Sequence, residues 1–352
     1  MWLEYLSRFP SLGVDTDILL PMKIGNKERL SFIDIERSYK LLADPFYWPK
    51  RIFERPEIRS FVLDRYIQKK HDIFQSTYFT TVNKKVPKVA VIYDMIYEIY
   101  GNRNDKWINF IIGMKEQVVN QATRVIAISE NTKTDLLNYY PKVKEENVEV
   151  ITLAANYKNK MIQRFLDFEE IQNRFHISIQ QGEYLLFVGK RNGYKNFSLV
   201  ESLLSHKNVM NMTALCVGGE KRAKESFNEL PNNNKVIYVG QISEIDLVNL
   251  YQNALALIYP SKYEGFGLPI LEAMENRCPV ICSNTSSLPE VGGDAAIYFD
   301  PQSLDSLREA FEKLLVPSFR NRLIEKGLEN AKRFSWDDSA RKLVDVYKTL
   351  CE

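Results

Sequence analysis

Tyr-Pro-Ser-Lys-Tyr-Glu-Gly-Phe-Gly-Leu-Pro-Ile-Leu-Glu-Ala-Met-Glu, residues 259–275, is the stretch that decides the fold. The apolar run Leu255–Tyr259 leads into it and predicts a strand. Gly265 and Gly267 allow a sharp turn and a close approach of a ligand to the backbone. Pro269 is typical of a helix start, where its missing N–H would lack a helical partner in any case. The stretch therefore predicts a strand, a tight turn and a helix whose first N–H groups can bind a phosphate.

Two glutamates flank this turn, Glu264 before the glycines and Glu272 inside the predicted helix. A phosphate at a helix start needs no carboxylate, so the two acids indicate a further ligand. A sugar is such a ligand, because its vicinal hydroxyls donate hydrogen bonds that a carboxylate can accept in pairs. One glutamate would hold a hexose and the other a ribose, on either side of a shared phosphate. The alternative is a tight strand-to-helix turn with incidental acids.

Strands and helices are predicted to alternate through the second half of the chain, where amphipathic stretches separate short apolar runs. One such stretch is Ser243–Asn253, whose Leu247, Leu250 and Tyr251 recur at helical spacing. This alternation is typical of a parallel sheet with helices on both faces. The predicted strands are Tyr184–Val188, Met212–Val217, Val236–Val239, Leu255–Tyr259, Val280–Cys282 and Ala296–Phe299.

The first half of the chain repeats the α/β pattern less regularly, so we expect two open α/β domains that bind ligands in the cleft between them. The crossing between the domains is predicted near Asn156–Lys160, with a longer connection through Gln181-Gly182 as the alternative. Ser129 is a predicted helix N-cap. The predicted strands are Asp17–Leu20, Ile73–Ser76, Val89–Tyr93, Val125–Ile128 and Val148–Leu153, and the predicted helices are Asp105–Gln121 and Ser129–Asn138.

Length and composition fit this division. A chain of 352 residues exceeds the ~100–200 residues of a typical single domain. Hydrophobic content of 45% with 26% charged residues is typical of a soluble globular protein. No apolar run approaches the ~18 residues that span a bilayer, and the first residues do not resemble a signal peptide. We therefore expect a cytoplasmic protein.

The charge and the cysteines exclude several other classes. A net charge of +2 argues against a nucleic-acid partner. Basic residues exceed acidic ones only in residues 1–160, which would suit anionic lipid or a phosphorylated acceptor, or is an ordinary solvated surface. The four cysteines are scattered along the chain, which predicts reduced thiols. The three histidines are not spaced as metal ligands usually are, so no metal site is expected.

The decisive stretch resembles the family-4 retaining glycosyltransferases (glycosyl transferases group 1), whose signature is Glu-x7-Glu in this setting. The matching strings around it are Pro260-Ser261, Cys278-Pro279-Val280, Ser286–Glu290 and Gly293–Ala296. The resemblance implies the GT-B fold of two Rossmann-like domains. It divides the chain into an acceptor-side domain (1–160), a nucleotide-sugar-binding domain (161–335) and a closing helix (336–352) that returns to the first domain.

The resemblance also implies roles for the pocket residues. Glu272 would bind the nucleotide ribose, and Glu264 would lie beside the donor sugar near the reacting centre. A second matching string, residues 186–196, implies cations that stabilise the leaving diphosphate: Lys195, and Arg191 with Lys190 as the alternative arginine position. Backbone or loop contacts to the donor are expected from Gly265, Phe266, Gly267, Leu268, Gly189 and Gly240.

The first domain departs from the family pattern in two places. A His-Asp pair is common at the end of a strand facing the acceptor, where this chain has Tyr93-Asp94, and Gln75 stands where histidine is frequent. Asp94 is therefore the candidate for contacting the acceptor hydroxyl or the donor sugar, with helix capping as its alternative role. The family's first strand is not found either, since the chain begins at what reads as the following helix, Trp2–Phe9.

The resemblance is strongest to bacterial polysaccharide mannosyltransferases. It implies transfer of mannose from GDP-mannose to a lipid-linked saccharide at the cytoplasmic membrane face, in O-antigen or capsule synthesis, without a cofactor or metal. A UDP-hexose donor is the first alternative. A GT-B-fold sugar-nucleotide epimerase and a non-catalytic nucleotide-sugar-binding subunit are the others.

Overall fold

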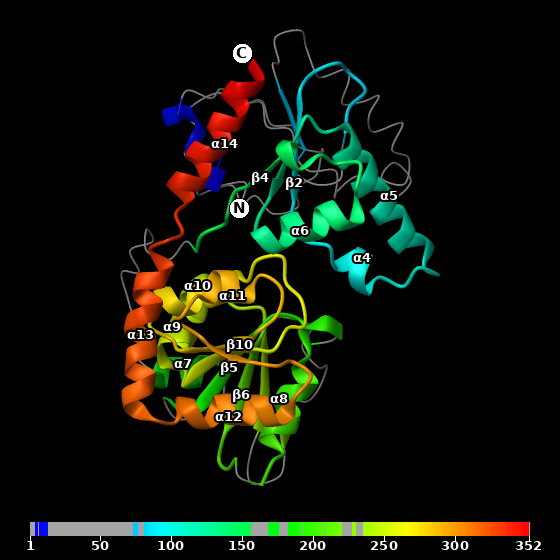
Figure 1. The fold of residues 1–352 in the computed structure, drawn as a ribbon. Coiled ribbons are helices and arrows are strands. Elements are labelled where there is room, and N and C mark those ends of the chain that lie inside the picture. The colour runs from blue at the N-terminus through cyan, green and yellow to red at the C-terminus, as the bar shows by residue number, and fades with distance from the viewer. Residues whose placement is uncertain are drawn as a thin grey trace. The chain divides into compact units, whose positions relative to one another are not determined.

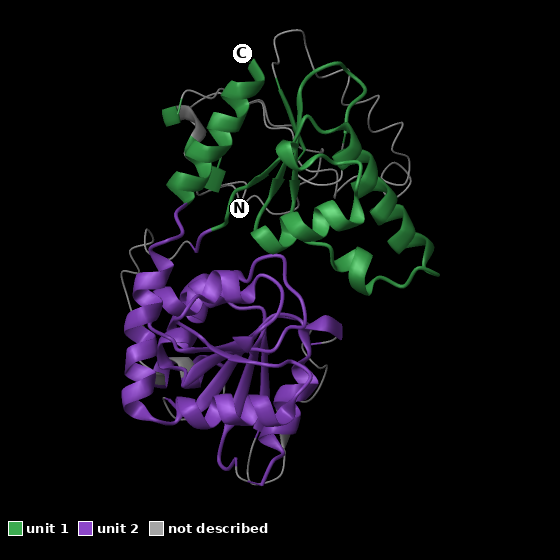
Figure 2. Cartoon of the chain, in the orientation of Figure 1, with its two compact units in different colours: residues 1–153, 336–352 green, residues 154–335 purple. Residues whose placement is uncertain are grey.

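The computed structural model describes residues 4–5, 7–12, 73–76, 81–155, 168–175, 182–191, 193–207, 209–219, 227–229 and 235–351. The chain forms two compact units, residues 1–153 with 336–352, and residues 154–335 (Figure 2). The predicted strand Asp17–Leu20 and the predicted crossing Asn156–Lys160 lie outside the described residues. Within the predicted helix Trp2–Phe9, the described Glu4 and Tyr5 are helical, a turn follows at Ser7 and Arg8, and a 3-10 helix begins at Phe9.

The first unit contains a parallel sheet of four described strands in the order β1-β2-β3-β4 (Figure 1). Its strands are β1 (Phe74–Ser76), β2 (Lys88–Ile92), β3 (Arg124–Ala127) and β4 (Val148–Val150). Its α-helices are α4 (Ile96–Tyr100), α5 (Lys106–Gln121), α6 (Glu130–Tyr139) and α14 (Trp336–Cys351), and two short 3-10 helices are η1 (Phe9–Leu12) and η4 (Glu145–Asn147).

Side-chain caps fix where the helices of the first unit begin. The Ser129 hydroxyl accepts a hydrogen bond from the Thr132 N–H at 3.0 Å, which confirms the predicted N-cap of α6. Asp105 caps α5 in the same way, at 2.8 Å from the Trp107 nitrogen. These bonds satisfy N–H groups that have no partner inside the helix.

The second unit is built on a seven-stranded sheet in the order β11-β10-β9-β5-β6-β8-β7, parallel except for the antiparallel edge pair β7 and β8. Its strands are β5 (Tyr184–Val188), β6 (Thr213–Val217), β7 (Phe227–Glu229), β8 (Lys235–Gly240), β9 (Ala256–Tyr259), β10 (Val280–Ser283) and β11 (Ile297–Phe299). Its helices are α7 (Phe168–Phe175), η5 (Gly193–Lys195), α8 (Phe197–Leu204), α9 (Glu244–Asn253), α10 (Leu268–Glu275), α11 (Leu288–Gly292), α12 (Leu304–Leu314) and α13 (Pro317–Ala331).

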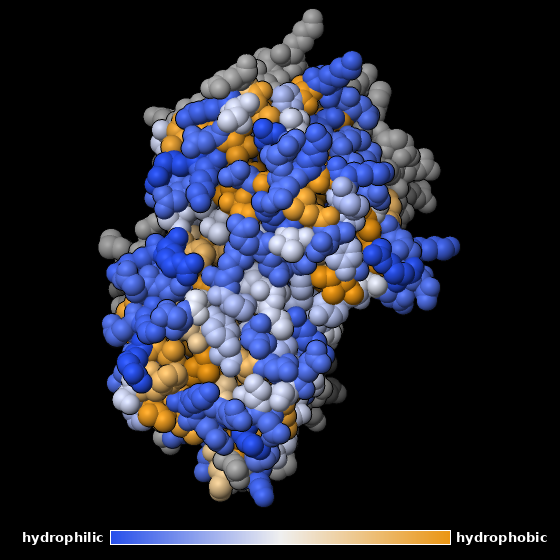
Figure 3. Space-filling model, viewed as in Figure 1, coloured by the Kyte–Doolittle hydropathy of each residue, from blue (hydrophilic) through white to orange (hydrophobic). Residues whose placement is uncertain are grey.

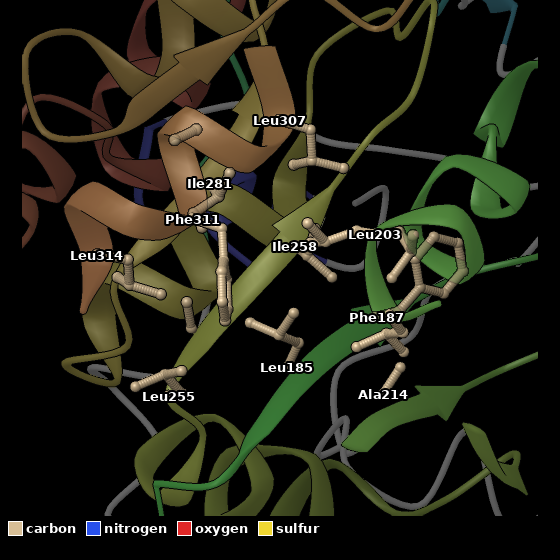
Figure 4. Close-up of a cluster of buried hydrophobic side chains, with 14 of the residues drawn as sticks. Leu185, Phe187, Leu203, Ala214, Leu255, Ile258, Ile281, Leu307, Phe311 and Leu314 are labelled. Atoms are coloured by element: carbon tan, nitrogen blue, oxygen red, sulfur yellow. The ribbon is translucent and has the colours of Figure 1, made fainter. Parts of the chain in front are cut away.

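Helices cover both faces of this sheet, with α8 and α12 on one side and α9, α10 and α11 on the other (Figure 1). Alternate strand residues therefore face different helices. Leu185 and Phe187 join the apolar cluster with Phe311 of α12 (Figure 4), whereas the Tyr184 hydroxyl donates to the Leu250 carbonyl of α9 at 2.5 Å. Burial on both faces explains why the strands are continuous apolar runs, as the sequence predicts.

The face shown in Figure 3 is largely hydrophilic, with apolar residues interspersed. Exposed large apolar side chains include Met210 and the adjacent pair Leu315 and Val316. Among the described helices, none combines the length and the apolar character needed to cross a bilayer. Surface apolar residues of this kind are normal in a folded protein.

Candidate functional site

The turn between β9 and α10 has the strand, turn and helix order that the sequence predicts. Gly267 is the N-cap of α10 and has φ 109°, a conformation that residues with a Cβ rarely adopt. A Cβ there would also come within 2.9 Å of Leu288. Pro269 occupies the first turn of the helix, as expected. Leu268 and its neighbours thus place a helix N-terminus directly after Glu264.

Two serines before α11 hold the main chain of this turn. The Ser286 hydroxyl accepts from the Glu264 N–H at 3.0 Å. The fully buried Ser287 hydroxyl lies 2.9 Å from the Glu264 carbonyl oxygen and 2.8 Å from that of Phe266, and donates to them. Both serines belong to a matching string in the sequence, but no local pattern assigns them this role. Their contacts fix the backbone on both sides of the Glu264 side chain.

We expect Ser287→Ala to destabilise the protein by about 1–2 kcal/mol, because two buried carbonyls lose their donor. Affinity for a nucleotide sugar should fall about threefold to tenfold as the turn loosens. Thermal melting and titration calorimetry measure the two effects. Ser283→Ala is the matched control: Ser283 is also fully buried, but its hydroxyl has no hydrogen-bond partner among the described residues. Equal effects of the two substitutions would contradict the role given to Ser287.

Lys195 and Glu264 form an ion pair at the start of α10, with 2.6 Å between Nζ and Oε1. Their side chains are only 16% and 10% exposed. The Tyr259 hydroxyl, at the end of β9, accepts a hydrogen bond from the lysine ammonium group at 3.4 Å. Burial, and then the Glu264 charge, raise the pKa of Tyr259 well above its usual value, so its hydroxyl keeps its proton. The three side chains form one polar cluster beside the helix N-terminus.

Arg191 contacts a different part of the unit. Its guanidinium donates to the Gly218 carbonyl at 3.3 Å and lies 4.4 Å from the centre of the Tyr238 ring. These groups lie at the ends of β6 and β8, whereas Lys195 contacts the turn after β9. Neighbouring Lys190 is exposed. The two predicted cations therefore leave one loop, the loop after β5, and contact groups at the ends of different strands.

Glycines terminate three adjacent strands beside Arg191. The Gly189 N–H donates to the Val217 carbonyl at 2.9 Å, and the Gly218 N–H donates to the Gly240 carbonyl at 2.7 Å. All three glycines have positive φ. The main chains of β5, β6 and β8 consequently meet at their carboxyl ends, where ligands of open parallel sheets bind.

Glu272 lies on α10 and has its own partner, the buried Tyr251 of α9, whose hydroxyl donates to Oε2 at 3.0 Å. Burial raises the pKa of Glu272 to about 7, and the Tyr251 hydrogen bond opposes that rise. Glu264 and Glu272 are thus held by separate partners. Phe266 between them is buried and packs edge-on against Phe334, so only its main chain is offered to a ligand.

Asp94 lies in the first unit, just after β2. Its Oδ1 accepts a hydrogen bond at 3.0 Å from the N–H of Ile96, the first residue of α4, although the N-cap position itself is Met95. Gln75, at the other unusual position, accepts from the Tyr347 hydroxyl of α14 at 2.9 Å. Across the described residues, no group of three or more His, Cys, Asp or Glu side chains is arranged to hold a metal ion.

Comparison with known proteins matches the glycosyl transferases group 1 family to residues 168–330. The chain is 45% identical over 114 residues to O-antigen chain mannosyltransferase B of Escherichia coli, covering 32% of this chain and 30% of that protein. It is 27% identical over 226 residues to O-antigen chain mannosyltransferase RfbU of Salmonella typhimurium LT2, covering 61% and 59%. The structure of WaaG, a glycosyltransferase involved in lipopolysaccharide biosynthesis, matches with a TM-score of 0.68 at 17% identity over 98% of this chain and 94% of its own.

The similarity to WaaG concerns the fold, and it confirms the predicted α/β class and GT-B fold. The two relatives confirm the predicted resemblance to bacterial polysaccharide mannosyltransferases, although this chain spans less than two thirds of the length of either. The matched region includes Lys195, Glu264 and Glu272. The chain therefore carries a glycosyl transferases group 1 domain, which lies within its second compact unit.

Proposed function

We propose that the protein is a retaining glycosyltransferase that transfers a hexose from a nucleoside diphosphate sugar to a saccharide hydroxyl. The observation that carries the proposal is the Lys195–Glu264 ion pair beside the N-terminus of α10. It combines a cation and helix N–H groups suited to a diphosphate with a carboxylate suited to sugar hydroxyls. Glu272, four residues into the helix, supplies a second carboxylate suited to a ribose.

The donor that we favour is GDP-mannose, and the acceptor a lipid-linked saccharide of a cell-surface polysaccharide at the cytoplasmic membrane face. This choice is supported by the names of the relatives, which are O-antigen mannosyltransferases. UDP-hexoses are the alternative donors and are tested beside GDP-mannose.

In the proposed reaction, the acceptor oxygen bonds to the anomeric carbon on the face from which the diphosphate departs. The bond between that carbon and the phosphate oxygen breaks, and the leaving phosphate takes the acceptor proton. Lys195 and the first N–H groups of α10 stabilise the charge that develops on the phosphate, with Arg191 as a further cation. Glu264 holds the donor sugar, and Asp94 contacts the acceptor hydroxyl or that sugar.

A thermal-shift panel of GDP- and UDP-sugars tests the donor, because a ligand that binds only the folded state raises the melting temperature. We expect the largest shift with GDP-mannose. Incubation with acceptor, followed by analysis of the new linkage, then tests transfer and anomeric configuration. Conversion of the sugar nucleotide without acceptor would indicate an epimerase, and binding without transfer or hydrolysis a non-catalytic subunit. An inverted product would contradict the retaining mechanism.

Turnover is expected to persist within about twofold when EDTA removes divalent cations. The physical reason is that Lys195, Arg191 and the helix N-terminus supply the positive charge that faces the leaving diphosphate. Initial rates with EDTA, and again after excess magnesium is added back, measure the effect. Loss of turnover in EDTA that magnesium restores would contradict this part of the proposal.

A further inference from the structure

The first unit contains a fully buried ion pair that has no role in the reaction proposed above. Lys115 of α5 and Glu98 of α4 are each 1% exposed, and their Nζ and Oε2 atoms are 2.8 Å apart. The Tyr140 hydroxyl, at the end of α6, donates to the other Glu98 oxygen at 2.5 Å. Burial, and then this bond to Glu98, raise the pKa of Tyr140 well above its usual value, so it remains a donor. Three helices are joined through one carboxylate.

Stability does not explain such a pair. Removing two charges from water costs about as much as their attraction returns, and well-packed apolar residues in their place are often equally stable. A buried ion pair is better explained by a group that it holds in place. Lys115 has such a group, because its Nζ also donates to the main-chain carbonyl of Asp94 at 2.9 Å.

The Asp94 turn lies at the carboxyl end of β2, the edge of a parallel sheet where ligands bind. Lys115 donates a hydrogen bond to the main-chain carbonyl of Asp94, and the Ile96 N–H donates to the Asp94 carboxylate. Met95, the next residue, is fully buried, with its sulfur 3.8 Å from Lys115 Nζ. One of the contacts that hold the Asp94 turn therefore comes from a buried ammonium group.

We propose that Lys115, held by Glu98 and Tyr140, is a positioning residue that fixes the Asp94 turn for contact with the acceptor hydroxyl or the donor sugar. The proposal rests on the proposed function for its purpose. The geometry itself, an ammonium group bridging α4, α5 and the turn after β2, is independent of it.

The test is the double variant Lys115→Met with Glu98→Gln, which removes both charges and leaves Tyr140 an acceptor. We expect it to melt within a few degrees of the parent. Amide hydrogen exchange in residues 93–97 should accelerate at least about fivefold, and kcat should fall about tenfold while donor affinity stays within about twofold. If the Lys115–Glu98 pair served stability alone, a folded variant would show unchanged amide exchange in residues 93–97. Its kcat would also change no more than its donor affinity.

The matched control is Lys133→Met with Glu145→Gln, which removes a lysine–glutamate pair that joins α6 to η4 on the surface of the same unit. It should change neither exchange at 93–97 nor kcat. If the buried double variant fails to fold, Glu98→Asp replaces it, because aspartate keeps the charge but is too short to reach both partners. Accelerated exchange at 93–97 is again expected.

Unchanged exchange at 93–97 in a folded variant would overturn the proposal, whether or not the parent transfers sugar, because exchange is measured without substrate. Faster exchange with unchanged kcat in an active parent would also overturn it. Failure of the parent to transfer any sugar would count against the proposed function alone, since the exchange result still decides whether Lys115 positions the turn.

Discussion

Glu264→Gln is expected to lower kcat about 100-fold while nucleotide affinity changes less than about threefold. Glutamine keeps the shape of the side chain but removes the negative charge that pairs with Lys195 and accepts hydrogen bonds from sugar hydroxyls. An interaction that strengthens in the transition state affects turnover rather than binding. Losses of about 10²–10³ are typical when one such group is removed. Steady-state kinetics, with calorimetry on the nucleoside diphosphate, separate the two effects. Equal turnover in variant and parent would remove Glu264 from the reacting centre.

A loss of stability has to be separated from this loss of activity. Glu264→Gln removes the anion that pairs with Lys195, whose side chain is only 16% exposed. Breaking a buried pair is destabilising, whereas removing both members is often neutral. The double variant Glu264→Gln with Lys195→Met should therefore regain most of the lost melting temperature. It should not regain activity, since the diphosphate has then lost its cation as well. Recovery of both together would show that the ion pair acts only on stability.

Tyr259→Phe provides a graded control at the same site. It removes the hydroxyl that accepts a hydrogen bond from Lys195 but leaves the Lys195–Glu264 ion pair intact. The expected loss of kcat is about threefold to tenfold, because a hydroxyl that contacts the ion pair contributes less than a charged member of the pair. The order Tyr259→Phe, then Glu264→Gln, then the double variant, ranks the contributions of the cluster. A larger loss from Tyr259→Phe than from Glu264→Gln would contradict the assigned roles.

The central strands of the second unit could be predicted because they are buried on both faces. A run such as Tyr184–Val188 is apolar throughout, and the structure has β5 at those residues. The edge strand β7 (Phe227–Glu229) was not predicted, since a three-residue strand with a single apolar residue carries no such signal. Helix starts were predictable where a capping serine precedes them, as at Ser129.

Only those parts of the site that are formed by residues close together in the sequence could be predicted. The turn after β9 and the loop with Lys195 can each be recognised alone, but their ion pair joins residues 69 positions apart. Tyr251, Ser287 and Lys115 were missed for the same reason: each acts through a partner far along the chain, and buried tyrosine, serine or lysine has no periodic signature. Arg191 and Lys195 were predicted to lie in one loop, and only the structure shows that their contacts are at different strand ends.

Glu272→Gln is expected to change donor affinity and stability in opposite directions. Affinity for the nucleotide sugar should fall about tenfold to 100-fold at pH 8, because hydrogen bonds to a carboxylate contribute about 1.5–3 kcal/mol. The melting temperature at the same pH should rise, because glutamine cannot acquire the charge that burial disfavours. Glu275→Gln, on the same helix, is the matched control and should leave affinity at pH 8 unchanged. Parallel losses of affinity and stability would indicate a damaged fold instead.

The sign of the stability effect follows from the pKa of Glu272, which burial raises from 4.5 to about 7. The folded state therefore holds the proton in a pH range where the unfolded chain has released it. The contribution of this group to stability is fully present below pH 4.5 and is lost as pH rises to about 7. The Glu272→Gln variant does not lose stability as pH rises through this range. Its melting temperature should therefore exceed that of the parent only above about pH 7. Differential scanning at several pH values measures it.

Donor binding should show the reverse pH dependence, because ribose hydroxyls need the ionised carboxylate. In the parent, affinity for the nucleotide sugar should rise about tenfold per pH unit below 7 and level off above it, whereas the Gln variant should show no such slope. The ligand must be the nucleotide sugar, since a free diphosphate titrates near pH ~6 itself. Tyr251→Phe removes the hydroxyl that stabilises the charged form, so it should move the midpoint of the affinity profile to higher pH. A midpoint that stays in place would mean that another group governs donor binding.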